Sequence, residues 1–154
     1  MAKNYRVDIQ GDEELVRKLK AMSKGFRTKA LLHAVTQGGE IVEREASARA
    51  PRRKGAGGGT LKRSITTVKL KSTSKLAKVG VSWRKGKASR TAAFYGIMLE
   101  KGTRSRRRKD GARMGTGPAR PFLIPAFDST REQVAREIKE QLSRLIRLEA
   151  KKGL

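Results

Sequence analysis

The sequence predicts an α+β fold, and three observations support this prediction. Residues 5–9 alternate between apolar and polar side chains, which indicates a short N-terminal strand with one buried face. Two apolar, β-branched segments within 61–83 are separated by a short polar stretch, which predicts a central antiparallel β-hairpin. Residues 126–148 repeat apolar side chains at helical spacing, which predicts a long C-terminal helix.

Two helices are expected between the first strand and the hairpin. Asp12 can cap the first helix, whose apolar stripe consists of Leu15, Val16, Leu19 and Met22. The second helix is expected to start near Thr28 and to end at Pro51, because proline disfavours helical geometry in the residue before it. Its predicted buried side consists of Leu31, Leu32, Val35, Ile41, Val42 and Ala46. Gly38 and Gly39 together cost about 1–2 kcal/mol relative to alanine, which indicates a kink or a close crossing with another helix.

The later elements are expected in the order hairpin, short helix, long basic loop and long C-terminal helix. The first hairpin strand is expected within 61–72, with a phase slip that indicates a bulge or a twist, and the second within 75–83. A short helix over 91–102 is expected to place Phe94, Tyr95, Met98 and Leu99 on its apolar side. The final helix is expected after Pro125, with Phe127, Val134, Ile138, Leu142, Leu145 and Leu148 as its apolar positions. All of these elements are assigned to a single domain, 1–154.

The charge balance is strongly basic. The chain has 38 Lys and Arg residues against 14 Asp and Glu residues, a formal net charge of +24. A charge that serves only solubility is usually about 2–8, whereas a field of this size attracts polyanions. Nucleic acid is therefore the first partner to consider, followed by an anionic membrane surface. Hydrophobic residues make up only 36% of the chain, so the predicted core is lean and would benefit from burial against partner subunits.

Composition also bears on the compartment. The chain has no cysteine, which excludes disulfides and thiolate metal sites and is compatible with a reducing compartment. Residues 1–14 lack the apolar core of a signal peptide, and no apolar run approaches the roughly 20 residues that span a bilayer. We therefore expect synthesis inside the cell and no membrane partner, since the long helices carry acids as well as bases.

No catalytic pattern is evident. His33 is the only histidine and lies within a helical pattern, where a structural role is the usual one. Residues 55–60, "GAGGGT", lack the Gly-Lys-Ser/Thr ending of a phosphate-binding loop. No serine occupies a nucleophile-elbow motif. We predict that the protein is not an enzyme and has no metal, cofactor or catalytic residues.

Basic residues gather in three predicted flexible loops, near 52–60, 84–91 and 101–120. The candidate contacts to DNA phosphate or to a partner are Arg52, Arg53, Lys54, Arg104, Arg106, Arg107, Arg108, Lys109 and Arg113. Loops of this kind can follow phosphates without reading bases. Few aromatic residues are interleaved with the charges, so stacking on single-stranded bases is not expected. The alternatives are solvated loops or contacts to acidic protein partners.

Four motifs occur in a recognisable order. They are "GDEELVRKLKAM", "EREASARAPRRKG…GTLKRSI", "AKVGVSW" and "FYGIMLEKGTR…GPARPFLIPAFD". Together they resemble the tail-completion or neck (head–tail joining) morphogenesis proteins of long-tailed bacteriophages. The residues that match the last and strongest motif are Tyr95, Glu100, Gly102, Thr103, Pro118, Ala119, Pro121, Phe122 and Pro125. The glycine-rich segment 55–59 and the basic segment 104–113 depart from the family pattern.

The resemblance implies a non-enzymatic structural protein of the virion, located at the head–tail junction. It implies a ring, sixfold if the protein is a tail terminator and with twelvefold possible, between the connector or stopper and the tail tube. Genomic DNA would pass through such a ring and meet the basic loops by nonspecific phosphate contact. Two alternative functions do not depend on the resemblance. One is a free, sequence-nonspecific nucleic-acid-binding protein, and the other is a nuclease that uses scattered acids. The oligomeric state separates the ring from the first of these.

The segment 104–117 is expected to reach a neighbouring subunit or the DNA channel. Glu100, where this excursion begins, is predicted to pair with an arginine of its own chain or of a neighbouring subunit. Three prolines, at 118, 121 and 125, are expected to fix the return of the chain, because proline locks φ. The apolar run 122–124 is expected to pin that return to the core.

Overall fold

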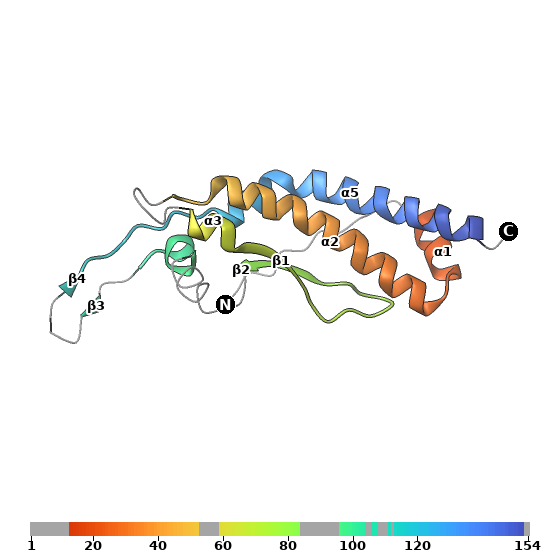
Figure 1. Ribbon diagram of the computed structural model, residues 1–154, viewed down its shortest axis with the longest axis horizontal. Helices are drawn as coiled ribbons and strands as arrows, with labels where there is room; N and C mark the ends of the chain where they lie inside the picture. Colours follow the sequence, from red (N-terminus) through yellow and green to blue (C-terminus); the bar gives the residue numbers. More distant parts are fainter. Residues whose placement is uncertain are drawn as a thin grey trace. The chain divides into compact units, whose positions relative to one another are not determined.

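The computed structural model describes residues 13–52, 59–83, 96–103, 106–107, 111 and 113–152. The elements, in order, are α1 (Glu13–Ala21), α2 (Lys24–Arg49), α3 (Thr60–Ser64), β1 (Ile65–Lys69), β2 (Val79–Trp83), β3 (Arg106–Arg107), β4 (Arg113–Met114) and α5 (Leu123–Lys152) (Figure 1). Residues 96–101 are also helical. β1 and β2 form one two-stranded sheet, and β3 pairs antiparallel with β4 in another. The predicted α+β class is confirmed, while the strand expected over 5–9 lies outside the described residues.

Two compact units can be distinguished along the chain. The first comprises Met1–Val42, Thr67–Gly80 and Thr130–Leu154, and the second comprises Glu43–Thr66 and Val81–Ser129. Four elements, α2, α5, β1 and β2, contribute residues to both units. The division therefore does not follow successive segments of the sequence, and a single domain stays a prediction.

α2 begins four residues earlier than the sequence predicts. The backbone N–H of Phe26 donates to the Ser23 hydroxyl at 3.2 Å, so Ser23 acts as the N-cap. Thr28, the predicted start, lies inside the helix and donates its hydroxyl to the Lys24 carbonyl at 3.0 Å. The prediction was wrong because Ser23 is the better cap. The helix ends at Arg49, two residues before Pro51, as expected.

In the first unit, α2 and α5 present buried residues at every fourth position. This series consists of Ala30, Ala34, Gly38 and Val42 on α2 and Thr130, Val134, Ile138, Leu142 and Ile146 on α5, and Ile41 is buried beside it. Side chains spaced by four form the ridges that pack helices against each other. A Cβ added at Gly38 would lie 3.0 Å from Val134 Cγ1 and 3.1 Å from Ile138 Cγ1. The larger side chains of α5 therefore pack against the small residues of α2. This confirms the close crossing with another helix that was expected at Gly38 and Gly39.

Part of the predicted core of α2 is wrong. Leu31, Leu32 and Val35 are only half-buried, because they lie outside the buried series, whereas Ile41, Val42 and Ala46 are buried as predicted. On α5, Val134, Ile138 and Leu142 are buried as predicted. Phe127 and Leu145 are half-buried, Leu148 is exposed, and the buried residue near the end of the helix is Ile146.

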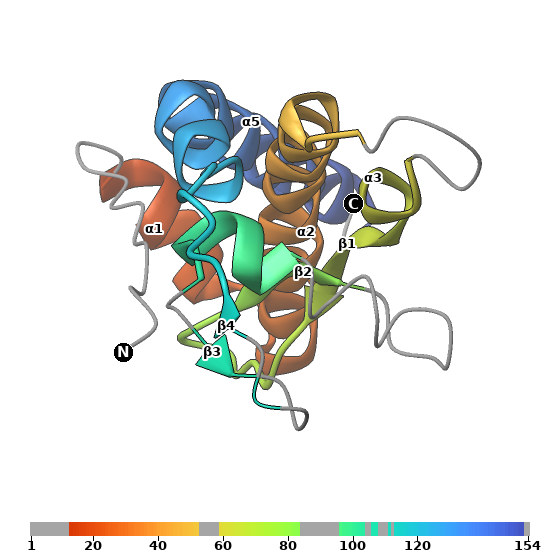
Figure 2. The same cartoon turned by 90° about the vertical axis from the view of Figure 1, so that its left-hand side faces the viewer.

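The sheet approaches α2 beside Gly39. A Cβ at this position would lie 2.9 Å from both Thr67 Cγ2 of β1 and Val79 Cγ1 of β2. Figures 1 and 2 show β1 and β2 lying along α2. Neighbouring glycines of one helix thus serve two contacts, Gly38 toward α5 and Gly39 toward the sheet.

We expect Gly39→Ala to destabilise the protein by about 1–2 kcal/mol, although alanine favours a helix over glycine by about 1 kcal/mol. The new methyl would overlap two branched side chains that are themselves packed. Gly25→Ala is the matched control, since nothing lies within 4 Å of a Cβ there, and it should be neutral or stabilising. Urea unfolding followed by circular dichroism measures both. A Gly39→Ala protein as stable as the control would contradict the close packing.

The hairpin forms, but with shorter strands than the sequence predicts. Residues 60–64 form α3 instead of the start of the first strand. Its turn is closed by local hydrogen bonds, from Arg63 N–H to the Gly59 carbonyl at 3.1 Å and from the Ser64 hydroxyl to the Leu61 carbonyl at 2.7 Å. Gly59 supports this turn with φ +94°, a left-handed conformation that glycine adopts readily. Nine residues, 70–78, then join β1 to β2.

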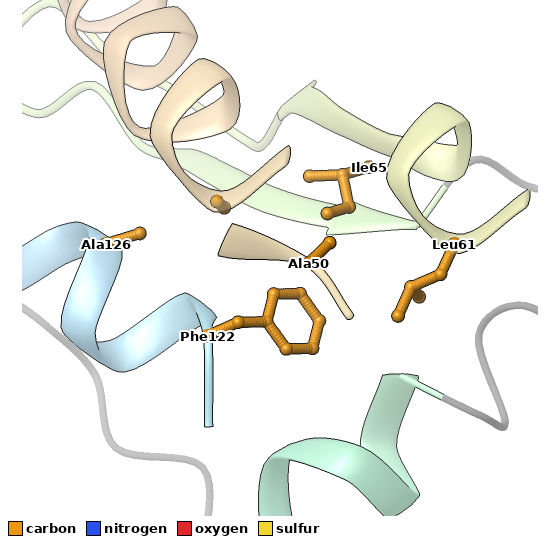
Figure 3. Packing of buried hydrophobic residues seen from close by; sticks show 6 residues of the cluster. Ala50, Leu61, Ile65, Phe122 and Ala126 are labelled. Carbon is orange, nitrogen blue, oxygen red and sulfur yellow. The ribbon is translucent and has the colours of Figure 1, made fainter. Parts of the chain in front are cut away.

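The second unit has a small apolar core. It consists of Ala46, Ala50, Leu61, Ile65, Phe122 and Ala126. Phe122 is 1% exposed, and its ring points into the cluster toward Ala50 (Figure 3). Trp83 packs against this core, and a Cβ at the buried Gly96 would overlap its indole.

α5 starts at Leu123, so Pro125 lies in its first turn and not before it. The prediction that the helix follows Pro125 was wrong. Proline is tolerated in a first turn because the N–H that it lacks would have no acceptor within the helix. No described helix has an apolar stretch long enough to cross a membrane.

Candidate functional site

We call residues 103–117 the basic arm, and the described residues of this segment pair as an antiparallel ribbon. At its base Thr103 and Gly117 form an antiparallel bridge, in which Thr103 N–H donates to the Gly117 carbonyl at 3.0 Å. Gly117 N–H donates in turn to the Thr103 hydroxyl at 2.8 Å. Farther out, β3 pairs with β4, with Arg106 opposite Met114 and Arg107 opposite Arg113. Figure 1 shows this ribbon leading away from the helical residues 96–101.

Backbone contacts beside the bridge hold the two ends of the arm together. Gly102 has φ +73°, and a Cβ there would lie 3.0 Å from both Ala119 N and the Gly117 carbonyl oxygen. Only glycine fits both the conformation and the space. The Arg120 N–H donates to the Leu99 carbonyl at 2.7 Å, which joins the returning chain to helix 96–101.

Glu100 connects this base to the start of α5. Its Oε2 accepts hydrogen bonds from Phe122 N–H at 2.8 Å and Leu123 N–H at 3.0 Å, and its Oε1 accepts one from Ile124 N–H at 3.1 Å. The first N–H groups of a helix have no acceptor within it, and the positive end of the helix dipole favours a carboxylate there. The predicted arginine partner is not found among the described residues, where the carboxylate caps a helix instead.

These contacts give the strongest sequence motif a physical explanation. Glu100, Gly102 and Thr103 meet the returning chain at Gly117, Ala119 and Phe122. Of the other motif residues, Pro118, Ala119 and Pro121 are exposed, Pro125 is half-buried, and Tyr95 lies outside the described residues. We call the set of contacts made by Glu100, Gly102, Thr103 and Arg120 the clasp. Gly117 was missed from the sequence, where nothing marks it as the partner of a residue fourteen positions earlier.

The structure locates only some of the predicted phosphate contacts. Arg106, Arg107 and Arg113 belong by their backbone to β3 and β4, where a flexible loop was expected. Arg52 is exposed, with its Nε 3.9 Å from the position of a Cβ at Gly59. The other candidates, Arg53, Lys54, Arg104, Arg108 and Lys109, lie outside the described residues, as does the basic loop 84–91.

Among the described residues no three His, Cys, Asp or Glu side chains are grouped so as to hold a metal ion. His33 is exposed on α2. Among the described residues, a shifted pKa is found on α1, where Lys18, 2.6 Å from Glu14, lowers the pKa of that exposed carboxyl. It lies in the first unit, and the arm and clasp lie in the second.

A family model described as "Bacteriophage HK97-gp10, putative tail-component" matches residues 13–102, more than half of the chain. The chain belongs to this family. It is therefore a structural component associated with the tail of a bacteriophage, located in the virion and in contact with other virion proteins. Comparisons with curated proteins and with solved structures gave no match.

The matched region of this tail component ends within the clasp. Glu100 and Gly102 lie inside it, while the basic arm and α5 follow it. The family thus covers α1, α2, the hairpin and one side of the clasp. The basic arm, with six Lys or Arg residues among residues 103–117, therefore lies beyond the match.

Proposed function

We propose that this tail component forms a ring at the head–tail junction, as a tail-completion, tail-terminator or neck protein that joins the connector to the tail tube. The basic arm lines or flanks the DNA channel of that ring. The observation that carries this proposal is the clasp, which fixes both ends of a cationic ribbon on a folded base.

The charge of the arm favours DNA phosphate as its ligand. Residues 103–117 contain six Lys or Arg residues and one acid, Asp110. Five of the six are arginines, whose planar guanidinium matches phosphate oxygens in pairs. A ribbon of this kind contacts the backbone of DNA without reading its sequence, which suits a channel through which a whole genome passes.

Unburied apolar surface supports association into a ring. Large hydrophobic side chains are exposed on both units, including Val16, Ile97, Ile124 and Leu148. Burial of such side chains between subunits would compensate for the lean core, at about 25 cal/mol per Å² of apolar surface. A sixfold ring suits a tail terminator, with twelve subunits as the other arrangement. We propose a structural role without catalysis.

The mass of the purified protein in solution, measured by light scattering, tests the ring. We expect a closed multimer whose mass is unchanged between low and high salt, because apolar contacts are not screened. A 30-base-pair duplex should bind to that multimer, and the binding should weaken steeply with salt. A monomer that associates only on DNA, and separates in salt, would contradict the ring and favour the free nucleic-acid-binding protein.

A further inference from the structure

A second basic surface lies on the hairpin, apart from the arm in sequence. We call residues 69–78 the hairpin tip. It carries four exposed lysines and no acid, and the lysines are Lys69, Lys71, Lys75 and Lys78. Two leucines stand among them, Leu70 at 50% and Leu76 at 53% exposure. None of the four lysines forms a recorded ion pair within the described part of the chain.

The tip is held in one shape by its own hydrogen bonds. Thr73 and Leu76 exchange backbone bonds of 2.7 and 3.3 Å across the turn. The Ser72 hydroxyl accepts from Lys78 N–H at 3.2 Å and donates to the Leu70 carbonyl at 3.1 Å. Leu70 N–H donates to the Lys78 carbonyl at 3.0 Å, which closes the base of the tip. A preformed surface loses little conformational entropy when it binds.

We propose that the hairpin tip docks on another protein of the virion, at a site where acidic residues surround an apolar patch. The two leucines distinguish the tip from a phosphate-binding surface, because aliphatic side chains gain nothing from contact with phosphates but are stabilised by burial against protein. The type of basic residue also distinguishes the tip from the arm. The tip has four lysines and no arginine, whereas the arm has five arginines, whose guanidinium groups match phosphate oxygens in pairs, and one lysine.

A partner with negative charge fits the tip better than a second copy of this chain does. The tip carries four lysines and no acid, so a contact between the tips of two copies would place like charges against each other. Opposite charges around an apolar contact both speed the encounter and reject wrong partners. This inference rests on membership of the tail-component family and not on the ring or on DNA binding.

Photocrosslinking in assembled phage identifies what the tip touches. Lys75→p-benzoylphenylalanine, at the turn of the tip, should crosslink to one other virion protein, identified by mass spectrometry of purified particles. The same substitution at the exposed Lys29 of α2 is the control and should not crosslink to that protein. Crosslinks from position 75 to DNA or to a second copy of this chain would overturn the proposal, and so would their absence in infectious particles.

Variants separate the docking site from the DNA contact. Lys71→Glu with Lys75→Glu should lower the titre of a complemented deletion phage by about tenfold or more, as loss of a central contact does. Lys24→Glu with Lys29→Glu changes the charge equally on exposed positions of α2 and should spare the titre. Leu76→Ser, which keeps every charge, should lower the titre while leaving the affinity for a 30-base-pair duplex unchanged. A normal titre for Leu76→Ser would overturn docking, whatever the arm variants do.

Discussion

Replacing the five arginines of the basic arm with glutamine lowers the affinity for duplex DNA by about 100-fold at roughly 0.1 M salt, if the arm follows the phosphate backbone. The positions are Arg104, Arg106, Arg107, Arg108 and Arg113. Each phosphate contact contributes about 0.9 to the slope of log affinity against log salt concentration, so the loss of five contacts should reduce the magnitude of the slope by about 4–5. Fluorescence anisotropy with a 30-base-pair duplex, between about 50 and 200 mM salt, measures both quantities.

The control removes the same charge from elsewhere. Five exposed cations on α1 and α2 can be changed to glutamine together, namely Arg17, Lys20, Lys24, Lys29 and Arg44. If the arm is the DNA contact, this variant should lose far less affinity than the arm variant, although the net charge of the two is equal. Equal losses would mean that DNA responds to the total charge of the protein, which would contradict a site on the arm.

Deletion of 104–113 tests the arm in the particle. Thr103 and Gly117, which form the bridge at its base, remain in that variant, and so does Glu100. The fold should therefore persist, with a far-ultraviolet circular dichroism spectrum and a Tm close to those of the parent. We expect defective assembly or poor retention of DNA in the head. Normal infectivity from the deletion would contradict a function for the arm in the virion.

Elements that depend on short-range patterns could be predicted from the sequence. The long helices and the hairpin follow from spacings within a few residues, and both are present as α2, α5, β1 and β2. Which side chains are buried could not be predicted as well, because burial depends on what a helix meets. Leu31 has more apolar surface than Ala30, yet Ala30 is buried and Leu31 is half-buried, because Ala30 belongs to the series of α2 that includes Gly38, where α5 approaches closely.

The contacts of the clasp could not be predicted from local sequence patterns. Glu100 and Phe122 are 22 positions apart, and no local periodicity relates them. The motif indicated that Glu100, Gly102 and Thr103 belong together, but an acid beside many arginines is read most simply as one half of an ion pair. The cap could not be foreseen because α5 was expected to begin after Pro125. With its true start at Leu123, three N–H groups face the carboxylate.

Glu100→Ala should destabilise the protein by about 2–3 kcal/mol, since it leaves three N–H groups of α5 without their acceptor. Two of the three belong to Phe122 and Leu123, which pack in or against the core of the second unit, so water replaces the carboxylate poorly there. Glu100→Gln keeps one acceptor oxygen but has an NH₂ group where the other stood, and we expect about half the loss. Urea unfolding measures both variants.

Hydrogen exchange at the base of the arm should detect the loss of the clasp independently of the free energy of unfolding of the whole protein. Glu132→Ala removes an equal charge from an exposed position of α5 and should change the free energy of unfolding by less than about 0.5 kcal/mol. Under conditions where Glu100→Ala is still folded, hydrogen exchange should be faster at Thr103 and Gly117 N–H, which close the base of the arm, than in Glu132→Ala. Equal stability and equal exchange in the two variants would mean that Glu100 does not hold the arm. Faster exchange at both N–H groups, with weaker DNA binding, would show that Glu100 sets the geometry of the basic arm that follows it.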